Sequence, residues 1–188
     1  MESLSKYQIL FNDYLETNKQ KPSPHGLYAP IEYILSLGGK RLRPLLALMA
    51  TEAFGNKPEE ALPAALSVEV FHNFTLIHDD IMDQAPIRRG APSVHNKWNE
   101  NTGILSGDAM LIQAYQCLEP YQNDLFVKLI KHTSKTALEV CEGQQYDMDF
   151  ETQKDVSISA YLEMIRLKTA VLVGHSLKIG AWIGNASD

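Results

Sequence analysis

The chain has 188 residues, of which 45% are hydrophobic and 21% are charged. These proportions fit a globular domain with a sizeable core and exclude a disordered chain. The formal net charge of -6 argues against a general nucleic-acid-binding protein, which needs a basic face. The most apolar stretch, residues 170–183, contains His175 and Lys178, so no membrane span is expected. The N-terminus lacks the pattern of a signal peptide, and we expect one cytoplasmic domain over residues 1–188.

The hydrophobic period is helical over most of the chain. The apolar face of a first helix is predicted by Leu4, Tyr7, Phe11, Tyr14 and Leu15. Prolines and a glycine in residues 21–26 break this helix, and a short second helix is expected to end at Gly38 and Gly39. A third helix is expected to begin near Pro44, a good first-turn residue, and to end at residues 55–56.

The second half of the pattern predicts one long helix followed by several more. Residues 58–84 are rich in Ala, Leu, Val and Phe and predict a central helix of roughly 40 Å, whose first turn Pro63 shifts or kinks. Residues 85–92 are expected to form a loop. Further helices are predicted over residues 103–119, 123–147 and 157–188, the last capped by Ser157. No alternating run predicts a strand, so the expected fold class is all-α.

The strongest chemical feature is the sequence D-D-I-M-D at residues 79–83. On a helix, Asp79 and Asp83 lie one turn apart on one face, where two like charges repel. A magnesium ion removes this conflict, and it prefers one or two carboxylates together with substrate phosphate oxygens and waters. The alternative is an acidic, solvated helix end. Because His72 lies two turns before Asp79 on the same face, helix phase aligns it with both carboxylates and favours a functional site.

Two basic segments accompany this acidic one. Arg88 and Arg89 follow it within a short loop, where they either pair with the acidic helix end or bind phosphate, which guanidinium matches bidentately. Residues 38–44 place three cations, among them Lys40 and Arg43, between a double glycine and a helix start. Such a backbone permits close approach of an anion, and the helix dipole favours it. The alternative is a basic solvated turn.

Polar residues also interrupt two apolar helical patterns nearer the end of the chain. Lys168 and Thr169 stand inside an apolar helix, where a lysine needs an anionic partner or a route to water. Gln144 and Asp147 lie about one turn apart on another helix. Ordinary buried hydrogen bonding explains this second pair as well as a ligand role does.

These motifs together resemble those of the trans-isoprenyl diphosphate synthases, whose short-chain members include farnesyl and geranylgeranyl diphosphate synthases. The resemblance is carried by residues 38–44, 76–83 and 88–90, and by Gly107-Asp108, Gly143-Gln144 with Asp147, and Lys168-Thr169. The motifs stand in the family's order, at similar intervals, through nearly the whole chain. Several independent motifs in register make the likeness specific, whereas any one of them alone is weak.

The resemblance implies an isoprenoid synthase fold, a bundle of helices around a deep central cavity, and a homodimer. It implies that Asp79 and Asp83 bind Mg²⁺ that bridges to an allylic diphosphate. Arg88 and Lys168 would hold that same diphosphate, and Thr169 and Gln144 would also bind substrate. The diphosphate of isopentenyl diphosphate would be held by Lys40, Arg43, His72 and Arg89. Asp79, Asp83 and Lys168 would be the catalytic residues of a condensation of these two substrates.

One departure concerns the C-terminal part of the family pattern. The family has a second aspartate-rich motif on a later helix, and none follows Lys168 here. We therefore expect the C-terminal helices to be missing, as in a piece of a longer enzyme, and the 188-residue chain alone to be inactive. A shortened homologue is the alternative. Two other functions remain open: a terpene cyclase, which needs no second diphosphate site, and a non-catalytic partner subunit of a heteromeric prenyl transferase.

Product length is expected to depend on residues about one turn before Asp79. Thr75 lies four positions back, about 40° from the Asp79 direction on a helix, and Phe74 lies five back. A growing prenyl tail that runs beside this helix would meet both side chains. In the family, bulk at these positions limits chain length. One aromatic and one small residue therefore imply a product of fifteen or twenty carbons.

Overall fold

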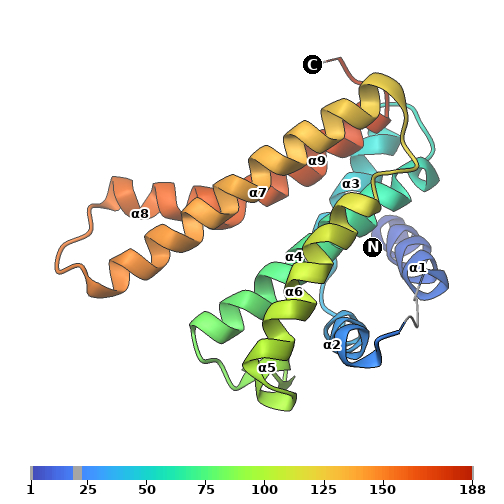
Figure 1. Ribbon diagram of the computed structural model, residues 1–188. Coiled ribbons are helices and arrows are strands. Elements are labelled where there is room, and N and C mark those ends of the chain that lie inside the picture. Colours follow the sequence, from blue (N-terminus) through green and yellow to red (C-terminus); the bar gives the residue numbers. More distant parts are fainter. Residues whose placement is uncertain (1, 19–22, 188) are drawn as a thin grey trace.

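The computed structural model describes residues 2–18 and 23–187, and its architecture is helical (Figure 1). The α-helices are α1 (Glu2–Thr17), α2 (His25–Ser36), α3 (Leu42–Ala53), α4 (Leu62–Met82), α5 (Val94–Lys97), α6 (Glu100–Gln116), α7 (Asn123–Thr152), α8 (Ile158–Ile165) and α9 (Val171–Ile183). The predicted break at residues 21–26 is described from Ser23 onward, and residues 21 and 22 lie outside the described part. None of the helices in the described ranges is long and apolar enough to cross a membrane.

Helix α4 forms the centre of the molecule, as its composition predicts. It packs against α6 on one side and against α3 and α9 on others, and it is buried along most of its length (Figure 1). A 3₁₀ turn, η1 (Pro58–Ala61), precedes it, and Pro63 lies in its first turn. The start of the helix is therefore shifted at Pro63, as predicted. Proline fits the first turn because N–H groups there have no partner within the helix, so its missing N–H costs no hydrogen bond.

The segment expected to be a loop contains a small β-hairpin. Strand β1 (Ile87–Arg88) pairs antiparallel with β2 (Ala91–Pro92). Arg89 and Gly90 lie between the strands with φ of 52° and 79°, the pair of positive angles that a tight two-residue turn demands. The prediction of no strand was therefore wrong at this point, because two-residue strands are too short to show alternation.

The final predicted helix is divided into three parts. Ser157 caps α8, since its Oγ accepts a hydrogen bond from the Ala160 N–H at 3.2 Å, as predicted. After α8 the chain forms a π-helical turn, η2 (Arg166–Ala170), and continues as α9. This π turn, which contains Lys168 and Thr169, is the difference from the predicted uniform helix. Single π turns inserted in α-helices occur frequently at functional sites.

Close approach between α7 and η2 depends on Gly143. A Cβ atom at this position would lie 2.2 Å from the backbone nitrogen of Lys168 and 2.7 Å from its Cα atom. No side chain fits there without moving the backbone of η2. Gly143 therefore fixes how near the two polar segments of the sequence, residues 143–147 and 168–169, come to each other. In Figure 1, α7 is a long straight helix with α8 and α9 running back along it.

Candidate active site

A cleft of about 340 Å³ lies between α4, α7 and η2, with one residue from α3 at its wall. The predicted site residues that line it are Arg43, His72, Phe74, Thr75, Asp79, Gln144, Lys168 and Thr169. They come from four separate elements, so the fold brings together positions up to 126 residues apart in the chain. The other predicted residues, Lys40, Asp83, Arg88 and Arg89, are not among the lining residues of this cleft.

The acidic end of α4 stands at the edge of this cleft. Asp79 is partly buried and Asp83, the C-cap residue of α4, is exposed. The pKa of Asp79 is raised to about 6, chiefly by burial and also by the Asp83 and Asp80 carboxylates, while Lys168 and Arg88 act in the opposite direction. The free protein thus holds a carboxylate that is costly to ionise, next to a second one. A bound cation would relieve this conflict.

Asp80, the middle carboxylate of the acidic motif, has a different environment. It is buried, and the Arg88 guanidinium binds it through Nε at 2.9 Å and through Nη2. This contact raises the pKa of Arg88. Asp80 therefore anchors the β-hairpin to the end of α4 and holds Arg88 near Asp79 and Asp83. The sequence assigned Asp80 no separate role, although a third carboxylate facing away from the other two signals such a structural partner.

Lys168 finds its anionic partner on the neighbouring helix. Its Nζ donates to Asp147 Oδ2 on α7, which answers the requirement that a lysine in an apolar helix be paired. Gln144, one turn before Asp147, is buried and places Nε2 3.8 Å from Met82 Sδ. Its Oε1 is buried without a hydrogen-bond partner among the described residues. Such an atom inside a cleft is an acceptor available to a ligand.

His72 and Arg43 form the opposite polar wall. Arg43 Nη1 lies 3.1 Å from His72 Nε2. Burial, and then the charges of Arg43, Arg89, Arg88 and Arg41, lower the pKa of His72 to about 3. The imidazole is therefore neutral and its Nε2 accepts from Arg43. Arg43 Nε is buried and has no partner within the described ranges, so this wall also presents an unused donor.

Lys40 and Arg89 do not line this cleft, although the charge of Arg89 acts on His72. Lys40 is exposed beside a second hollow of about 530 Å³, between α1 and the Gly38–Arg41 loop. Arg89 Nη1 donates to the Gly38 carbonyl oxygen and lies 3.4 Å from Asn73 Oδ1. The sequence did not single out Asn73 or its partner Glu69. Their signal was present, since both are polar residues in an apolar helix and lie one turn apart.

Phe74 lines the cleft and packs against two rings of its own helix. Its ring meets Phe71 edge to face at 5.4 Å and His78 at 4.9 Å between centroids. Thr75 is turned back onto the helix, since its Oγ1 donates to the His72 carbonyl at 2.8 Å. His78 Nε2 is 3.2 Å from the Ile104 carbonyl oxygen of α6. Phe74 is therefore held by Phe71 and His78 of its own helix, and His78 is in turn bonded to α6.

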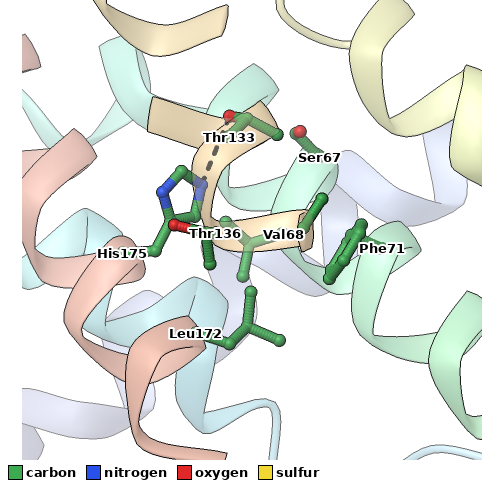
Figure 2. Close-up of a pocket in the computed structure, with 8 residues that line it drawn as sticks. Ser67, Val68, Phe71, Thr133, Thr136, Leu172 and His175 are labelled. Carbon is green, nitrogen blue, oxygen red and sulfur yellow. Dashed lines mark hydrogen bonds between the residues drawn. The ribbon is translucent and has the colours of Figure 1, made fainter. Parts of the chain in front are cut away.

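Beyond Phe71 the interior is closed. Figure 2 shows Ser67, Val68, Phe71, Thr133, Thr136, Leu172 and His175 converging from α4, α7 and α9. The space between them is too small for a water molecule. His175 is buried there, with Nε2 3.4 Å from Thr133 Oγ1 and Nδ1 2.7 Å from His132 Nδ1. This region serves as core and leaves no room for a ligand.

The carboxylates at the end of α4 are suitable ligands for a magnesium ion. Among the described residues no group of three or more His, Cys, Asp or Glu side chains is placed to hold a metal. Magnesium does not require one, since it commonly takes one or two carboxylates and completes its shell with phosphate oxygens and waters. Asp79 and Asp83 supply such a pair, beside an unpaired acceptor on Gln144. The residues present therefore fit a magnesium–diphosphate complex.

Comparison with known proteins assigns the chain to a family. A model of the polyprenyl synthetase family matches residues 24–188. A geranylgeranyl diphosphate synthase of Methanosarcina mazei is 50% identical over 167 residues, which are 88% of this chain and 52% of that protein. A short chain isoprenyl diphosphate synthase of Methanothermobacter thermautotrophicus is 37% identical over 188 residues, 100% of this chain and 58% of that protein.

Solved structures agree with these sequence matches. A crystal structure of a geranylgeranyl pyrophosphate synthase superposes with a TM-score of 0.97 at 56% identity, covering 100% of this chain and 57% of the other. Geranylgeranyl pyrophosphate synthetase from Geoglobus acetivorans superposes with a TM-score of 0.95 at 38% identity, covering 98% and 61%. The chain spans about half the length of the curated relatives it matches. It has the predicted all-α isoprenoid synthase fold, and it belongs to the polyprenyl synthetase family.

Proposed function

We propose that this chain forms the diphosphate-binding cleft of a magnesium-dependent prenyl transferase, which condenses an allylic diphosphate with isopentenyl diphosphate. One observation carries the proposal: a single cleft joins the Asp79 end of α4, the Lys168–Thr169 turn and the Arg43–His72 wall. Acidic, basic and apolar groups are thus arranged around one space, as an ionisable prenyl diphosphate requires. The named relatives include geranylgeranyl diphosphate synthases, which supports the same reaction class.

On this proposal, the acidic end of the cleft receives the allylic substrate. Asp79 and Asp83 would hold Mg²⁺, which when bound stabilises negative charge on a leaving diphosphate. Lys168, Arg88 and Thr169 would donate to oxygens of the same diphosphate, and Gln144, whose Oε1 has no partner among the described residues, would contact the bound complex. Donors aimed at a leaving diphosphate stabilise the charge that develops as the allylic C–O bond breaks.

The second substrate would lie against the basic side. Arg43 and His72 line the cleft itself, and Lys40 and Arg89 approach from the Gly38–Arg41 loop and the hairpin. We assign all four to the diphosphate of isopentenyl diphosphate, whose double bond then attacks the allylic cation. The resulting cation would then give up a proton to the released pyrophosphate, which forms the new double bond of the product. The apolar lining keeps water from the cation.

The closed interior supports a short product. Phe74 is held in place by Phe71 and His78, and the space beyond Phe71 does not admit water. We infer a product of fifteen or twenty carbons, with Phe74 and Thr75 as the residues that set it. We also propose a homodimer, which sedimentation velocity of the purified chain would test.

The isolated chain is expected to bind these substrates without turning them over efficiently. Met82 and Met148 line the cleft and are 50% and 41% exposed, so one side of it stands open to solvent. Water that reaches an allylic cation quenches it. Product analysis of the purified chain with both substrates should therefore show little condensation, and robust condensation would contradict this expectation.

Calorimetry with a non-hydrolysable allylic thiodiphosphate tests the proposed function. The wild-type chain should bind this ligand in the presence of Mg²⁺ and much more weakly without it. Asp79→Ala and Asp83→Ala should each abolish the magnesium-dependent binding, because the metal loses a carboxylate oxygen. Asp124→Ala, at the distant start of α7, is the matched control and should bind as wild type does. Equal affinity in all four proteins would refute the assignment.

A further inference from the structure

A series of buried polar contacts lies beneath the basic residues of the Gly38–Arg41 loop and the hairpin. Glu69, on α4, is 2% exposed, and its Oε1 accepts from Arg41 Nη1 and, at 2.7 Å, from Asn73 Nδ2. Asn73 is fully buried one turn further along α4. Its Oδ1 lies 3.4 Å from Arg89 Nη1, the same atom that donates to the Gly38 carbonyl oxygen. These contacts join α4 to both basic segments.

The Glu69 carboxylate acts on more arginines than the one it contacts. Burial lowers the pKa of Arg43 and that of Arg89, and in both cases Glu69 opposes the lowering. One buried carboxylate thus lies close to three guanidinium groups, those of Arg41, Arg43 and Arg89. Clustered cations repel one another when no anion is bound. Glu69 supplies the counter-charge that keeps them together in the free protein.

The backbone angles of Arg41 and Arg89 also require support from neighbouring residues. Arg41 and Arg89 have positive φ angles of 49° and 52°, which few residues other than glycine adopt without cost. Gly39, with φ of 129°, is so close to the Arg89 guanidinium that a Cβ would lie 3.1 Å from Arg89 Cζ. Arg89 is therefore held from two sides, by the Asn73 amide inside the protein and by the Gly38–Gly39 backbone at the surface.

On the function proposed above, we propose that Asn73, supported by Glu69, is a positioning residue for the isopentenyl diphosphate site. It acts through Arg89, whose guanidinium it holds against the Gly38–Gly39 backbone next to Lys40. A cationic site assembled before the ligand arrives binds it without the cost of ordering side chains. Arg88 depends on a different partner, Asp80, so the allylic side of the cleft does not rely on Asn73.

Two variants disturb this arrangement from opposite sides. Asn73→Ala removes the amide, and Gly39→Ala pushes the Arg89 guanidinium away from the exposed loop. Calorimetric titrations with isopentenyl diphosphate should show a loss of about tenfold or more in both, typical of a displaced charge-assisted contact. Affinity for the allylic thiodiphosphate with Mg²⁺ should stay within about twofold of wild type, since an unrelated set of residues holds it.

Matched controls separate positioning from general damage. Ser67→Ala also removes a buried polar contact on α4, the 2.6 Å bond from Ser67 Oγ to the Ala114 carbonyl. Gly55→Ala places a side chain at a positive φ of 97° with nothing within 4 Å. Both controls should keep both affinities, and thermal unfolding reports whether each variant is folded.

The outcomes distinguish this inference from the proposed function. Unchanged isopentenyl diphosphate affinity in the folded variants would overturn the positioning role, as would equal losses for both ligands. If Asn73→Ala does not fold, Glu69→Gln takes its place, because it keeps the shape of the side chain that binds the Asn73 amide and removes only its charge; it should also weaken isopentenyl diphosphate binding. A wild-type chain that binds the allylic ligand but not isopentenyl diphosphate would refute the two-substrate function and this inference with it.

Discussion

At the scale of single residues, the site is built from groups that the fold keeps in unfavourable states. Asp79 is a partly buried carboxylate beside two others, and its pKa is raised to about 6 mainly by burial. His72 stays neutral beside a cluster of arginines. Arg43 Nε and Gln144 Oε1 are buried without partners in the described part of the chain. Each of these costs stability in the free protein, and on the proposed function an anionic ligand with its metal would relieve that cost.

Asp79→Asn should therefore stabilise the free chain while it abolishes magnesium-dependent binding. An amide carries no charge to desolvate and does not repel Asp83. A rise of roughly 1–2 kcal/mol in the unfolding free energy at pH 7 is expected after discounting for solvent screening. Urea denaturation measures it, with Asp124→Asn as the control. A less stable Asp79→Asn variant would show that Lys168 attraction outweighs the cost of burial.

The buried histidines predict a loss of stability in acid. Burial, together with His132, lowers the pKa of His175 to about 3. The pKa of His72 is also lowered to about 3. The unfolded chain takes up these protons first, near its ordinary pKa of about 6.5. The stability that comes from keeping these two histidines neutral is therefore fully present above that pH. It is lost as the pH falls below it, by up to about 1.4 kcal/mol per pH unit for each histidine.

Urea midpoints measured from pH 7.5 to pH 5 test this dependence. His175→Asn removes one titrating group from the core, so its midpoint should depend less steeply on pH than that of the wild type. A wild-type midpoint that does not fall below pH 6.5, or equal slopes in the two proteins, would contradict the assigned pKa directions.

At the scale of elements, the contact between α7 and the π turn η2 determines where Lys168 stands. Gly143→Ala would drive a methyl group into the Lys168 backbone and should destabilise the protein by about 1–3 kcal/mol. It should also weaken binding of the allylic thiodiphosphate, because Lys168 and Thr169 move with the turn. Denaturation and calorimetry on the same variant measure the two effects together.

Gly174→Ala is the matched control for this change. Gly174 is an exposed glycine inside α9, and an added Cβ would meet nothing within 4 Å. Alanine is the better helix former, so this variant should be more stable by about 0.5–1 kcal/mol with unchanged affinity. Similar losses in both variants would show that the α7–η2 contact has no special role.

The helical period of the apolar residues predicted the α-helices well, but it did not predict the π turn or the β-hairpin. Apolar spacing identified α4, and its phase predicted His72, Asp79 and Asp83 on one face. In the structure His72 and Asp79 line the cleft, whereas Asp83 is exposed and does not line it. The π turn, which packs closely against Gly143, was not predicted, because the apolar period does not distinguish it from an α-helix. The hairpin was missed because its strands are two residues long. Glu69 and Asn73 were missed because their role depends on Arg41 and Arg89, which adopt positive φ angles that no local signal announced.

At the scale of the whole molecule, the chain covers 52% of the Methanosarcina mazei synthase that it resembles. Joined to the part of that synthase which it does not match, the chain should give a chimera that condenses both substrates. Phe74→Ala in the chimera should lengthen the products, because the ring that meets Phe71 and His78 no longer closes the cleft. Chromatography of dephosphorylated products measures this, and an unaltered distribution would place the floor elsewhere.

The claim on which the rest depends is that Asp79 and Asp83 hold the metal that binds the allylic diphosphate. A crystal structure of the chain soaked with Mn²⁺ and the allylic thiodiphosphate tests it most directly, since manganese is located by its anomalous scattering. We predict one or more anomalous peaks about 2 Å from carboxylate oxygens of both residues, bridged to the diphosphate. A fully bound ligand with no peak at either carboxylate would contradict the account.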